Sequence, residues 1–449
     1  MSTSTRNLVV IGSGFAGVWA ALAAARQRRR LGLSADIAIT IVSPQDYLGI
    51  RPRFYEAAFA EAKVALAPLL ARAGVGHVRA KVVAIDQARR VLELDSGRLR
   101  YDALVCAAGS ATTRPSLPGG ELMHDVDSFA GAEKTERHLR TLAAAPQPAP
   151  AAATVVIIGG GFTGIEAAAE MMTRLKALFG GRVAPRVILV ERAAHIGPDF
   201  GPNARAVIAT ALAQLGVETR PATSVRAIAP DVVTLSTGES LAAQTVLWTA
   251  GVHASPLTRL LAPAADAHGR VAVDATLRLP NDAPIWVAGD CAHALVDGKQ
   301  PSMMSCQHAT PQGKYAGHNA LSWLAGRRPQ PYEQHLYLTC LDIGEWGALI
   351  TMGFAHDRII ARGLEARPFK RFINETLIYP PAGDDAESLL RAAKPPAGGR
   401  LAAALFGRVL ASPTLRALVL SRAKKTAARP APTRVPSPRS AVEPARKSA

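Results

Sequence analysis

The chain begins with a pattern of apolar and polar residues that is typical of a strand, a turn and a helix. Residues 7–11 form a short apolar run, the glycine-rich segment Gly12–Gly17 follows, and an Ala-rich stretch then reaches Arg30. A second apolar run occupies residues 36–42. Short apolar runs bounded by glycine are typical of buried strands, and longer apolar stretches are typical of helices. These residues therefore predict a βαβ unit.

The same pattern returns in the middle of the chain. The apolar run 154–158 precedes the glycine-rich segment Gly159–Gly164, a helical stretch through Leu178 and the apolar run 187–190. Residues 143–153 are rich in Ala and Pro, a composition that predicts a connector, and we interpret this segment as a domain border. The chain is thus predicted to be an α/β protein with two Rossmann-like units.

Each glycine segment matches Gly-x-Gly-x-x-Gly between a strand and a helix. A single copy also occurs in purely structural turns, so the position between a strand and a helix is what makes the motif indicate dinucleotide binding. Glycines permit a tight turn and a close approach of the backbone, and the helix N-terminus offers free N–H groups to a pyrophosphate. Two such turns predict two bound dinucleotides.

The residue after the second strand of each unit indicates which nucleotide the unit accepts. Glu191 follows the run 187–190, where a carboxylate can accept hydrogen bonds from a ribose and repel a 2′-phosphate. This favours NADH over NADPH, although a solvated glutamate at a strand end is the alternative. Ser43 stands at the matching place in the first unit, and its hydroxyl makes a weaker contact.

Three further apolar runs end in glycine, at Gly109, Gly251 and Gly289, and the last glycine is followed by Asp290. A Gly-Asp pair alone indicates no more than a turn. Its position after a buried run, far downstream of the first glycine turn, makes Asp290 a candidate partner for a polyol chain.

Composition excludes several classes of protein. The 449 residues are 49% hydrophobic, which allows a substantial core, and no uncharged apolar run is long enough to span a bilayer. The N-terminus lacks a secretion signal pattern. Residues 394–449 contain twelve Lys and Arg and one acid, a net charge of +11, but no aromatic platform, so nucleic-acid binding is not expected. The four cysteines form no Cys-x-x-Cys pair, which argues against a zinc site and a dithiol relay.

This order of motifs resembles the two-dinucleotide flavoprotein oxidoreductases, and among them the type II NADH dehydrogenases, which are NADH:quinone oxidoreductases with FAD. The resemblance implies an FAD domain interrupted by an NADH domain, followed by a C-terminal α+β and helical region that associates with membranes. The expected domains are 1–112 and 251–330 for FAD, 113–250 for NADH, 331–399 for the C-terminal domain, 400–425 for basic amphipathic helices and 426–449 for a disordered tail.

The resemblance also implies the cofactor contacts. Gly12, Gly14 and Gly17 face the FAD pyrophosphate, Ser43 takes the place of the acid on the FAD ribose, Val82 contacts the adenine and Asp290 binds the ribityl chain. Gly159, Gly161 and Gly164 hold the NADH pyrophosphate, and Glu191 its ribose. The other implied cofactor-binding positions are Phe15, Ala16, Ala108, Gly109, Phe162, Thr163, Gly251 and Gly289.

The helix after the second glycine turn matches the family's Gly-x-Glu-x-x-x-Glu pattern at Gly164, Glu166 and Glu170. In the family the first glutamate lies near the nicotinamide and the flavin, so Glu166 is a candidate for cofactor orientation or proton relay. A first-turn acid favoured by the helix dipole is the structural alternative.

Residues 305–313 resemble the family segment that lines the quinone channel. Gln307 and Gln312 match, and glutamine amides can donate to a quinone carbonyl. Cys306 and Pro311 depart from the pattern, which leaves the acceptor open. Helix capping is the alternative for Gln307, and we interpret His308 as a structural ring.

The sequence therefore predicts an enzyme that passes electrons from NADH through FAD to a membrane quinone without pumping protons. The basic region 400–425 predicts peripheral attachment to the inner, cytoplasmic face of the cell membrane. An NADH-dependent reductase of a soluble carrier or oxygen, and a non-catalytic NADH sensor, are the alternatives. A homodimer is compatible with the sequence.

Overall fold

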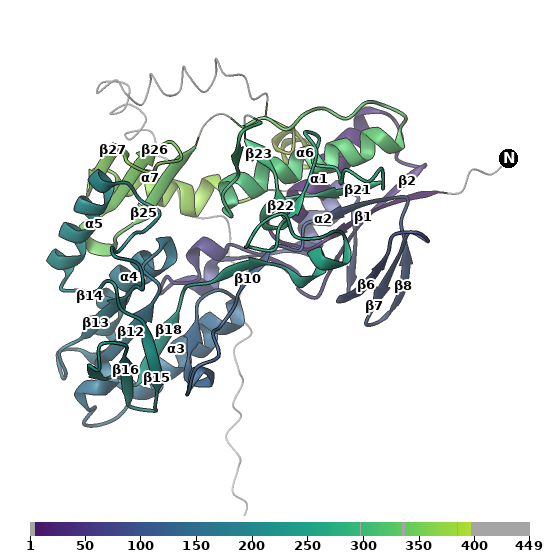
Figure 1. Cartoon of the computed structure of the whole chain (residues 1–449). Helices are drawn as coiled ribbons and strands as arrows, with labels where there is room; N and C mark the ends of the chain where they lie inside the picture. The colour runs from purple at the N-terminus through teal and green to yellow at the C-terminus, as the bar shows by residue number, and fades with distance from the viewer. Residues whose placement is uncertain (1–4, 297, 335–336, 384, 397–449) are drawn as a thin grey trace, which may run out of the picture.

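The computed structural model describes residues 5–296, 298–334, 337–383 and 385–396. Two five-stranded parallel sheets, each flanked by helices, form the two largest parts of the molecule (Figure 1). This confirms the predicted α/β fold with two Rossmann-like units. The C-terminal segments 400–425 and 426–449, predicted as basic helices and a disordered tail, lie outside the described residues.

The first unit contains the first glycine turn. Its strand order is β21-β9-β1-β2-β5, and every neighbouring pair is parallel. Its elements are β1 (Arg6–Ile11), α1 (Phe15–Arg30), β2 (Ile37–Ser43), α2 (Leu66–Ala73), β5 (Gly76–Arg79), β9 (Ala103–Cys106) and β21 (Ile285–Val287). All four residues of β9 and all three of β21 are buried, as expected for strands covered on both faces.

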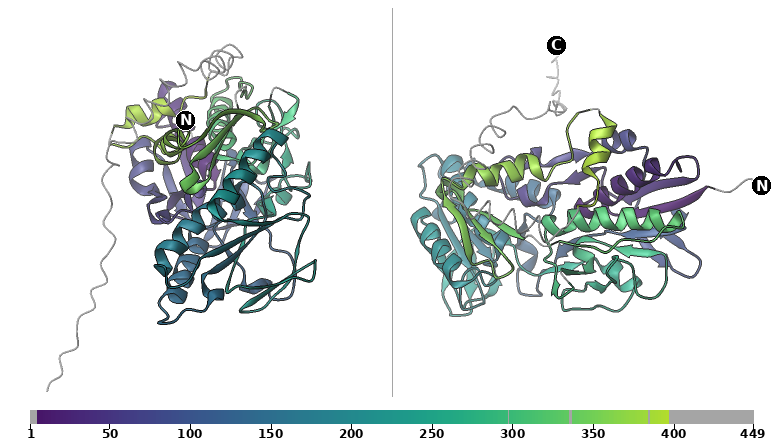
Figure 2. Two further views of the ribbon diagram at one scale, coloured as in Figure 1. Left: turned by 90° about the vertical axis from the view of Figure 1, so that its left-hand side faces the viewer. Right: turned by 90° about the horizontal axis from the view of Figure 1, so that it is seen from above.

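Helix α6 (Cys306–Leu324) lies beside α1, as both Figure 1 and Figure 2 show. Two of its glycines permit this close packing. A Cβ atom on Gly313 would overlap the carbonyl oxygen of Ala16, and one on Gly317 would overlap that of Ala20. The helices therefore meet backbone to backbone, which fixes the start of α6 relative to the first glycine turn.

The second unit has the strand order β11-β18-β12-β13-β14, again parallel throughout. Its elements are β11 (His124–Asp125), α3 (Phe129–Ala143), β12 (Thr154–Ile158), α4 (Phe162–Phe179), β13 (Arg186–Val190), α5 (Pro202–Leu215), β14 (Glu218–Arg220) and β18 (Thr245–Trp248). Four neighbouring strands, β18-β12-β13-β14, repeat the arrangement β9-β1-β2-β5 of the first unit, so both glycine turns follow the same strand of this arrangement. The edge strands differ, because β21 is the last strand of its unit along the chain and β11 is the first of its own.

The interpretation of residues 143–153 as a domain border is wrong. The segment joins α3 to β12, and the strands before and after it, β11 and β12, both pair with β18 in one sheet. Part of it also forms a short 3₁₀ helix, Pro150–Ala153, because proline is tolerated in a first helical turn. The segment is a connection inside the second unit.

The chain passes between the units along two short strands, β10 (Ser110–Thr112) and β19 (Val252–Ala254), which pair antiparallel. Figure 1 shows β10 between the two large sheets. We call this pair the crossing ribbon. Because β10 follows β9 of the first unit and β19 follows β18 of the second, the ribbon lies where both sheets end.

Small sheets of two or three strands complete the units. They comprise β3 (Tyr47–Gly49) with β4 (Lys63–Ala65), β6 (Val82–Asp86) with β7 (Val91–Leu94) and β8 (Gly97–Arg100), β15 (Val225–Ile228) with β16 (Val232–Leu235) and β17 (Ser240–Ala242), β20 (Val271–Ala272) with β22 (Ala292–His293), and β23 (Leu295–Val296) with β24 (Gln300–Pro301). All are antiparallel except the pair of β20 and β22, which is parallel.

A three-stranded antiparallel sheet follows α6. It consists of β25 (Leu338–Asp342), β26 (Ala348–Met352) and β27 (Arg358–Gly363), and it lies beside α5 of the second unit (Figure 1). Helices α7 (Arg367–Phe372) and α8 (Ala386–Ala392) come after it. The predicted α+β character of residues 331–399 thus agrees with the described residues of that range.

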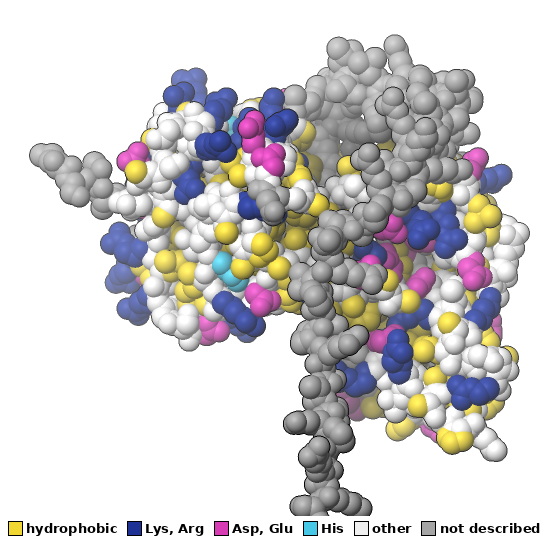
Figure 3. All heavy atoms as spheres, turned by 180° about the vertical axis from the view of Figure 1, so that it is seen from behind, with side chains coloured by type: hydrophobic (Ala, Val, Ile, Leu, Met, Phe, Trp, Pro, Cys, Tyr) yellow, Lys and Arg dark blue, Asp and Glu magenta, His cyan; other side chains and the backbone are white. Residues whose placement is uncertain are grey.

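Charged side chains of both signs are interspersed on the face shown in Figure 3. This agrees with the sequence, in which the large positive excess belongs to residues 394–449. Within the described part of the chain, no helix has the length and hydropathy needed to cross a bilayer.

Candidate functional site

The first glycine turn is built around backbone contacts that exclude side chains. Gly12 has φ +101°, and a Cβ atom on it would overlap the carbonyl oxygen of Ala107. A Cβ atom on Gly17 would in turn overlap the carbonyl oxygen of Gly12. Only glycine fits both positions, so the start of α1 is held directly against the ends of β1 and β9.

This turn leaves the N-terminus of α1 open. Gly14 is the N-cap and supplies no side-chain hydrogen bond, and the first turn of α1 contains no acid. Gly14 is exposed, and no atom lies within 4 Å of where its Cβ would be. Free N–H groups and the positive end of the helix dipole suit a phosphate group. The residues present therefore fit a pyrophosphate.

The second glycine turn has the same construction. Gly159 has φ +111°, and a Cβ atom on Gly164 would overlap its carbonyl oxygen. Gly161 caps α4 without a side-chain hydrogen bond, and nothing lies within 4 Å of its Cβ position. Thr163 in the first turn of α4 is exposed. We call the two turns with their helix N-termini the first and the second cradle.

Glu191 lies against the second cradle. Its carboxylate accepts hydrogen bonds from the backbone N–H groups of Gly160 (2.6 Å) and Ala193 (2.8 Å). The side chain is buried, and these bonds fix it at the end of β13 beside the glycine turn. The carboxylate of Glu191 is thus held in one orientation beside the second glycine turn.

Ser43 follows Val42 of β2 as Glu191 follows Val190 of β13, so the two residues occupy equivalent positions in their sheets, but their side chains have different partners. Its side chain is only 1% exposed, and its hydroxyl donates to the carbonyl oxygen of Gln45 (2.7 Å) and faces Nε2 of His77 (3.1 Å). The hydroxyl is therefore satisfied by protein partners. The predicted contact of Ser43 with an FAD ribose is not supported by this geometry.

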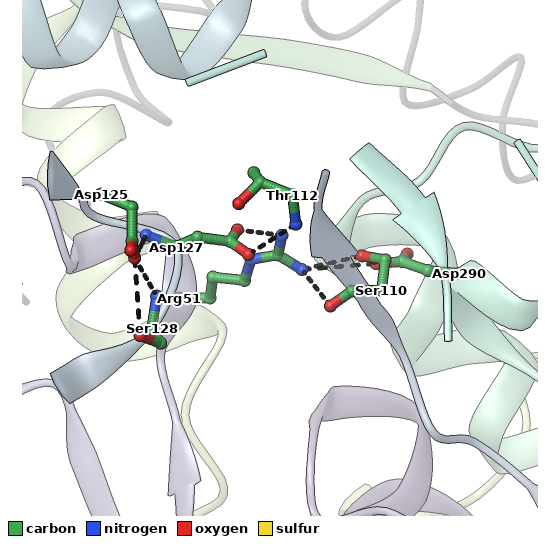
Figure 4. Close-up of polar contacts among 7 residues, drawn as sticks. All are labelled: Arg51, Ser110, Thr112, Asp125, Asp127, Ser128 and Asp290. Carbon is green, nitrogen blue, oxygen red and sulfur yellow. Dashed lines mark hydrogen bonds and ion pairs between the residues drawn. The ribbon is translucent and has the colours of Figure 1, made fainter. Parts of the chain in front are cut away.

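The Gly289-Asp290 turn joins the first cradle to the start of α6. A Cβ atom on Gly289 would lie 2.9 Å from Cβ of Ala16, so the turn approaches α1 closely. Oδ2 of Asp290 accepts a hydrogen bond from the hydroxyl of Ser110 (2.6 Å), and Figure 4 shows both side chains beside Arg51. Asp290 keeps a partly exposed carboxylate next to the crossing ribbon, where a polyol chain could bind it.

Gln312 of α6 holds the Gly289-Asp290 turn in place through hydrogen bonds. Its Oε1 accepts from the backbone N–H of Gly289 (2.8 Å), and its Nε2 donates to the hydroxyl of Ser302 (2.9 Å). The side chain is fully buried. Since both amide atoms have partners, the predicted contact of Gln312 with a quinone is not supported, and the residue instead positions the Asp290 turn.

Glu166 is held by a residue that the sequence did not single out. Lys370 of α7 donates from Nζ to Oε1 of Glu166 (2.8 Å), and the backbone N–H of Asp342 donates to the same oxygen (2.9 Å). Both side chains are buried. Burial raises the pKa of Glu166 despite the opposing ammonium. Burial lowers the pKa of Lys370, but the carboxylates of Glu166 and Asp342 outweigh it and raise that pKa above its ordinary value.

Lys370 also donates to the backbone carbonyl of Cys340 (2.8 Å), which ties α7 to β25. Glu170, one turn further along α4, accepts from the N–H of Ala57 (3.0 Å), and burial raises its pKa. The two glutamates share a helix face as predicted. They connect the second unit to the C-terminal sheet and to the first unit respectively.

The first residues of α6 lie against β25. With its nitrogen facing the carbonyl of Leu338, the Gln307 amide donates to that carbonyl (2.5 Å) and accepts from the Leu338 N–H (3.2 Å). His308 is buried, its Nδ1 lies 3.1 Å from the hydroxyl of Ser305, and burial lowers its pKa to about 4. A neutral, enclosed ring agrees with the interpretation of His308 as structural.

The cysteines are all free thiols. Burial raises the pKa of Cys306 to about 11 and that of Cys340 to about 12. Both thiols are therefore protonated at neutral pH and poor nucleophiles.

The remaining predicted positions surround the cradles. Phe15 and Ala16 are buried at the start of α1, and Phe162 packs on Phe200 with ring centroids 4.4 Å apart. Val82 is buried at the start of β6. Ala108 and Gly109 follow β9, and Gly251 precedes β19, so these three positions flank the crossing ribbon.

Comparison with known proteins agrees with this arrangement. The family model described as "Pyridine nucleotide-disulphide oxidoreductase" matches residues 6–313, more than half of the chain. The chain belongs to this family. An NADH dehydrogenase-like protein of Mycobacterium tuberculosis is 44% identical over 393 residues, covering 86% of this chain and 98% of the relative. The predicted resemblance to type II NADH dehydrogenases is thereby confirmed, and the chain is an oxidoreductase.

Two other relatives are named as enzymes that act on quinones. A demethylphylloquinone reductase of Synechocystis sp. is 30% identical, covering 78% of this chain and 88% of the relative. A type II NADH:quinone oxidoreductase of Staphylococcus saprophyticus is 25% identical, covering 84% and 96%. Among solved structures, NDH2 of Plasmodium falciparum in complex with NADH superposes with a TM-score of 0.70 at 12% identity, covering 87% of this chain and 97% of that one. That likeness shows a shared fold.

Proposed function

We propose that the chain is an NADH:quinone oxidoreductase with FAD as its resident cofactor. The observation that carries the proposal is the pair of open glycine cradles in units that share a four-strand arrangement. Only the second cradle has an acid, Glu191, fixed beside it. Two cradles suit two dinucleotides, and the acid selects a nucleotide with a free ribose hydroxyl for the second. FAD then belongs to the first cradle and NADH to the second.

The residues of the first unit would bind FAD. The turn formed by Gly12, Gly14 and Gly17 faces the pyrophosphate, and Asp290 accepts hydrogen bonds from the ribityl chain. Val82 offers its backbone to the adenine. Gln312 acts indirectly, because it holds the N–H of Gly289 and thereby orients the neighbouring carboxylate.

The residues of the second unit would bind NADH. Gly159, Gly161 and Gly164 face its pyrophosphate, exposed Thr163 offers a hydroxyl there, and Glu191 accepts from the ribose. A 2′-phosphate would place a second negative charge against Glu191, so NADPH should bind less well.

FAD, when bound, supplies the ring system that accepts a hydride from NADH and passes two electrons on. The chain itself needs only to orient the two rings and to hold protons near them. Glu166 lies in the first turns of the helix after the second cradle and pairs with the buried ammonium of Lys370, so we assign it to cofactor orientation or proton relay. Gln307 is half-buried and is the candidate for contact with the acceptor, where its amide would exchange the Leu338 backbone for a quinone carbonyl.

A quinone is the acceptor that the relatives favour, since a demethylphylloquinone reductase and type II NADH:quinone oxidoreductases are among them. The test is a steady-state assay of the purified chain with NADH and three acceptors, namely a short-chain quinone, ferricyanide and oxygen. The proposal predicts that the quinone gives the highest kcat/KM and NADH is preferred over NADPH. Faster turnover with oxygen or a soluble carrier, or none with any acceptor, would contradict it.

We also propose that residues 400–425 attach the enzyme to the inner face of the cell membrane, because the C-terminal region is strongly basic. The full chain should sediment with anionic vesicles and not with neutral ones. A chain lacking residues 400–449 should remain in the supernatant while keeping its activity with a water-soluble quinone. Equal sedimentation of both chains would contradict this attachment.

A further inference from the structure

One guanidinium lies at the meeting point of the two units. Arg51 begins a 3₁₀ turn (Arg51–Arg53) in the first unit, after β3. Figure 4 shows its side chain between Asp127 on one side and Ser110 and Asp290 on the other. Asp127 belongs to the loop between β11 and α3 of the second unit, so Arg51 contacts both units.

Toward the first unit, Arg51 joins the Asp290 turn. Its Nη1 donates to the hydroxyl of Ser110 (2.8 Å), which in turn donates to Oδ2 of Asp290 (2.6 Å). The same Nη1 lies 3.8 Å from Oδ2 of Asp290. The guanidinium therefore fixes the serine at the start of β10 and the carboxylate proposed to bind the ribityl chain.

Toward the second unit, Arg51 pairs through Nη2 with Oδ1 of Asp127. Oδ2 of Asp127 accepts from the backbone N–H of Thr112 (3.0 Å), the last residue of β10. The loop that carries Asp127 is itself fixed, because Oδ1 of Asp125 accepts from the N–H of Asp127 (3.2 Å). Ser128 then caps α3 by accepting from the N–H of Gly131 (3.0 Å).

These contacts hold β10 at both ends, at Ser110 directly and at Thr112 through Asp127. The crossing ribbon is where the backbone passes from one unit to the other, and two short strands alone resist bending poorly. A planar guanidinium can donate to two partners in fixed directions, which a lysine ammonium cannot do. The arrangement therefore depends on arginine and on its two groups of partners together.

We propose that Arg51 is a positioning residue that sets the orientation of the NADH unit relative to the FAD unit, and so the stacking of nicotinamide on flavin. The proposal rests on the proposed function for its consequence, but the contacts that carry it are independent of any ligand. A displacement of about 1 Å between reacting groups can lower a rate about a hundredfold. Loss of the Arg51 contacts should therefore slow hydride transfer without removing FAD.

The test compares Arg51→Gln, Arg51→Lys and Asp127→Asn with the unaltered full chain. Anaerobic stopped-flow reduction of the flavin at saturating NADH should be about tenfold slower or more in Arg51→Gln and Asp127→Asn. FAD content and the Kd for NADH should stay within about twofold, since both cradles are intact and Ser110 and Gln312 still hold the Asp290 turn. Arg51→Lys, which keeps the charge but loses one direction of donation, should be intermediate.

Arg114→Gln is the matched control. Arg114 pairs with Asp125 (2.7 Å), the last residue of β11, two positions before Asp127. Among the described residues it forms no hydrogen bond or ion pair with Ser110 or Asp290. This variant should keep the reduction rate of the unaltered chain. An equally large decrease in the flavin reduction rate of Arg114→Gln would contradict the positioning role. It would show that the stability of the loop, and not the contacts of Arg51 with both units, sets the rate.

Hydrogen exchange of the backbone, measured without added nucleotide, gives a second readout. Residues 110–112 should exchange faster in Arg51→Gln than in the unaltered chain, and the effect should be smaller in Arg114→Gln. An unaltered chain that takes up no flavin would refute the proposed function. Hydrogen exchange would still test whether the contacts of Arg51 hold residues 110–112. Unchanged exchange and reduction in Arg51→Gln, or loss of FAD from it, would overturn the positioning role.

Discussion

The two dinucleotide units repeat one construction and differ in what surrounds it. Each has five parallel strands, four of them in the same arrangement, and a helix whose glycine closes on the carbonyl of the first glycine of its turn. The residue after the second strand of each unit differs. The hydroxyl of Ser43 donates to the carbonyl oxygen of Gln45, whereas the carboxylate of Glu191 accepts from the backbone of its own glycine turn. The glycine geometry is thus common to both units, and under the proposed function the residues around it determine which dinucleotide binds.

The helices after the two turns also differ at their fifth residue. In α1 this residue is Trp19, over whose ring the ammonium of Lys314 lies at 4.2 Å from the centroid. In α4 it is Glu166, which is paired with Lys370. Both positions meet a lysine from a distant helix. An aromatic partner stabilises the fold, whereas a buried carboxylate can also hold a proton.

The largest effects should come from closing one cradle at a time. Gly17→Ala places a methyl group on the Gly12 carbonyl, so the chain should lose most of its FAD. Gly164→Ala does the same in the second unit, so flavin should remain while the KM for NADH rises about tenfold or more. Flavin absorbance and NADH kinetics distinguish the two results. Loss of flavin from Gly164→Ala alone would reverse the assignment of the cradles.

The two lysines give the next contrast. Lys370→Met leaves the Glu166 carboxylate buried without its cation and should lower the free energy of unfolding by about 3–5 kcal/mol. Lys314→Met removes a cation from an aromatic ring and should cost about 1 kcal/mol. Urea unfolding of both variants measures the difference. Equal decreases in the free energy of unfolding of the two variants would contradict the stated difference between the Glu166 and Trp19 sites.

The preference for NADH over NADPH should depend on Glu191 and not on Ser43. Glu191→Gln removes the charge that opposes a 2′-phosphate, so the preference of kcat/KM for NADH over NADPH should narrow about tenfold. Ser43→Ala should leave FAD content and NADH kinetics unchanged, because its hydroxyl serves only protein partners. An unaltered preference in Glu191→Gln would reject the ribose role.

A smaller effect should appear in the dependence of stability on pH. His124 and His138 lie side by side in the second unit, with ring centroids 4.3 Å apart, and burial lowers the pKa of His124 from 6.5 to about 4. The unfolded chain therefore binds more protons than the folded chain between these values. Stability should fall as the pH drops from about 6.5 toward 4, by up to about 1.4 kcal/mol per pH unit from this residue.

His124→Gln should make this dependence shallower. Thermal or urea unfolding at a series of pH values measures the slope for the variant and the unaltered chain. An identical slope in both would show that His124 does not contribute.

Much of the fold was predictable because it depends on local patterns. The helix predicted for residues 15–30 has those bounds, and the strand at 154–158 is also as predicted. The glycine turns follow from steric limits that act within a few residues. The segment 143–153 was misinterpreted because a Pro-rich connection inside a unit and a border between units share one composition.

The partners of the site residues were not predictable from the chain alone. Lys370 lies 204 residues after Glu166, and only the packing of α7 on β25 brings the two together. Gln312 matched a motif, but its direction depends on how α6 packs on α1. Arg51 carries no motif, and its role depends on where the loop bearing Asp127 lies.

The most direct test of two cradles serving two different dinucleotides is an anaerobic titration of the purified full chain, followed by flavin absorbance. The account predicts a yellow protein with one FAD per chain, bleached by stoichiometric NADH faster than by NADPH and restored by a short-chain quinone. A colourless chain that takes up no FAD, or a bound flavin that NADH does not bleach, would contradict it.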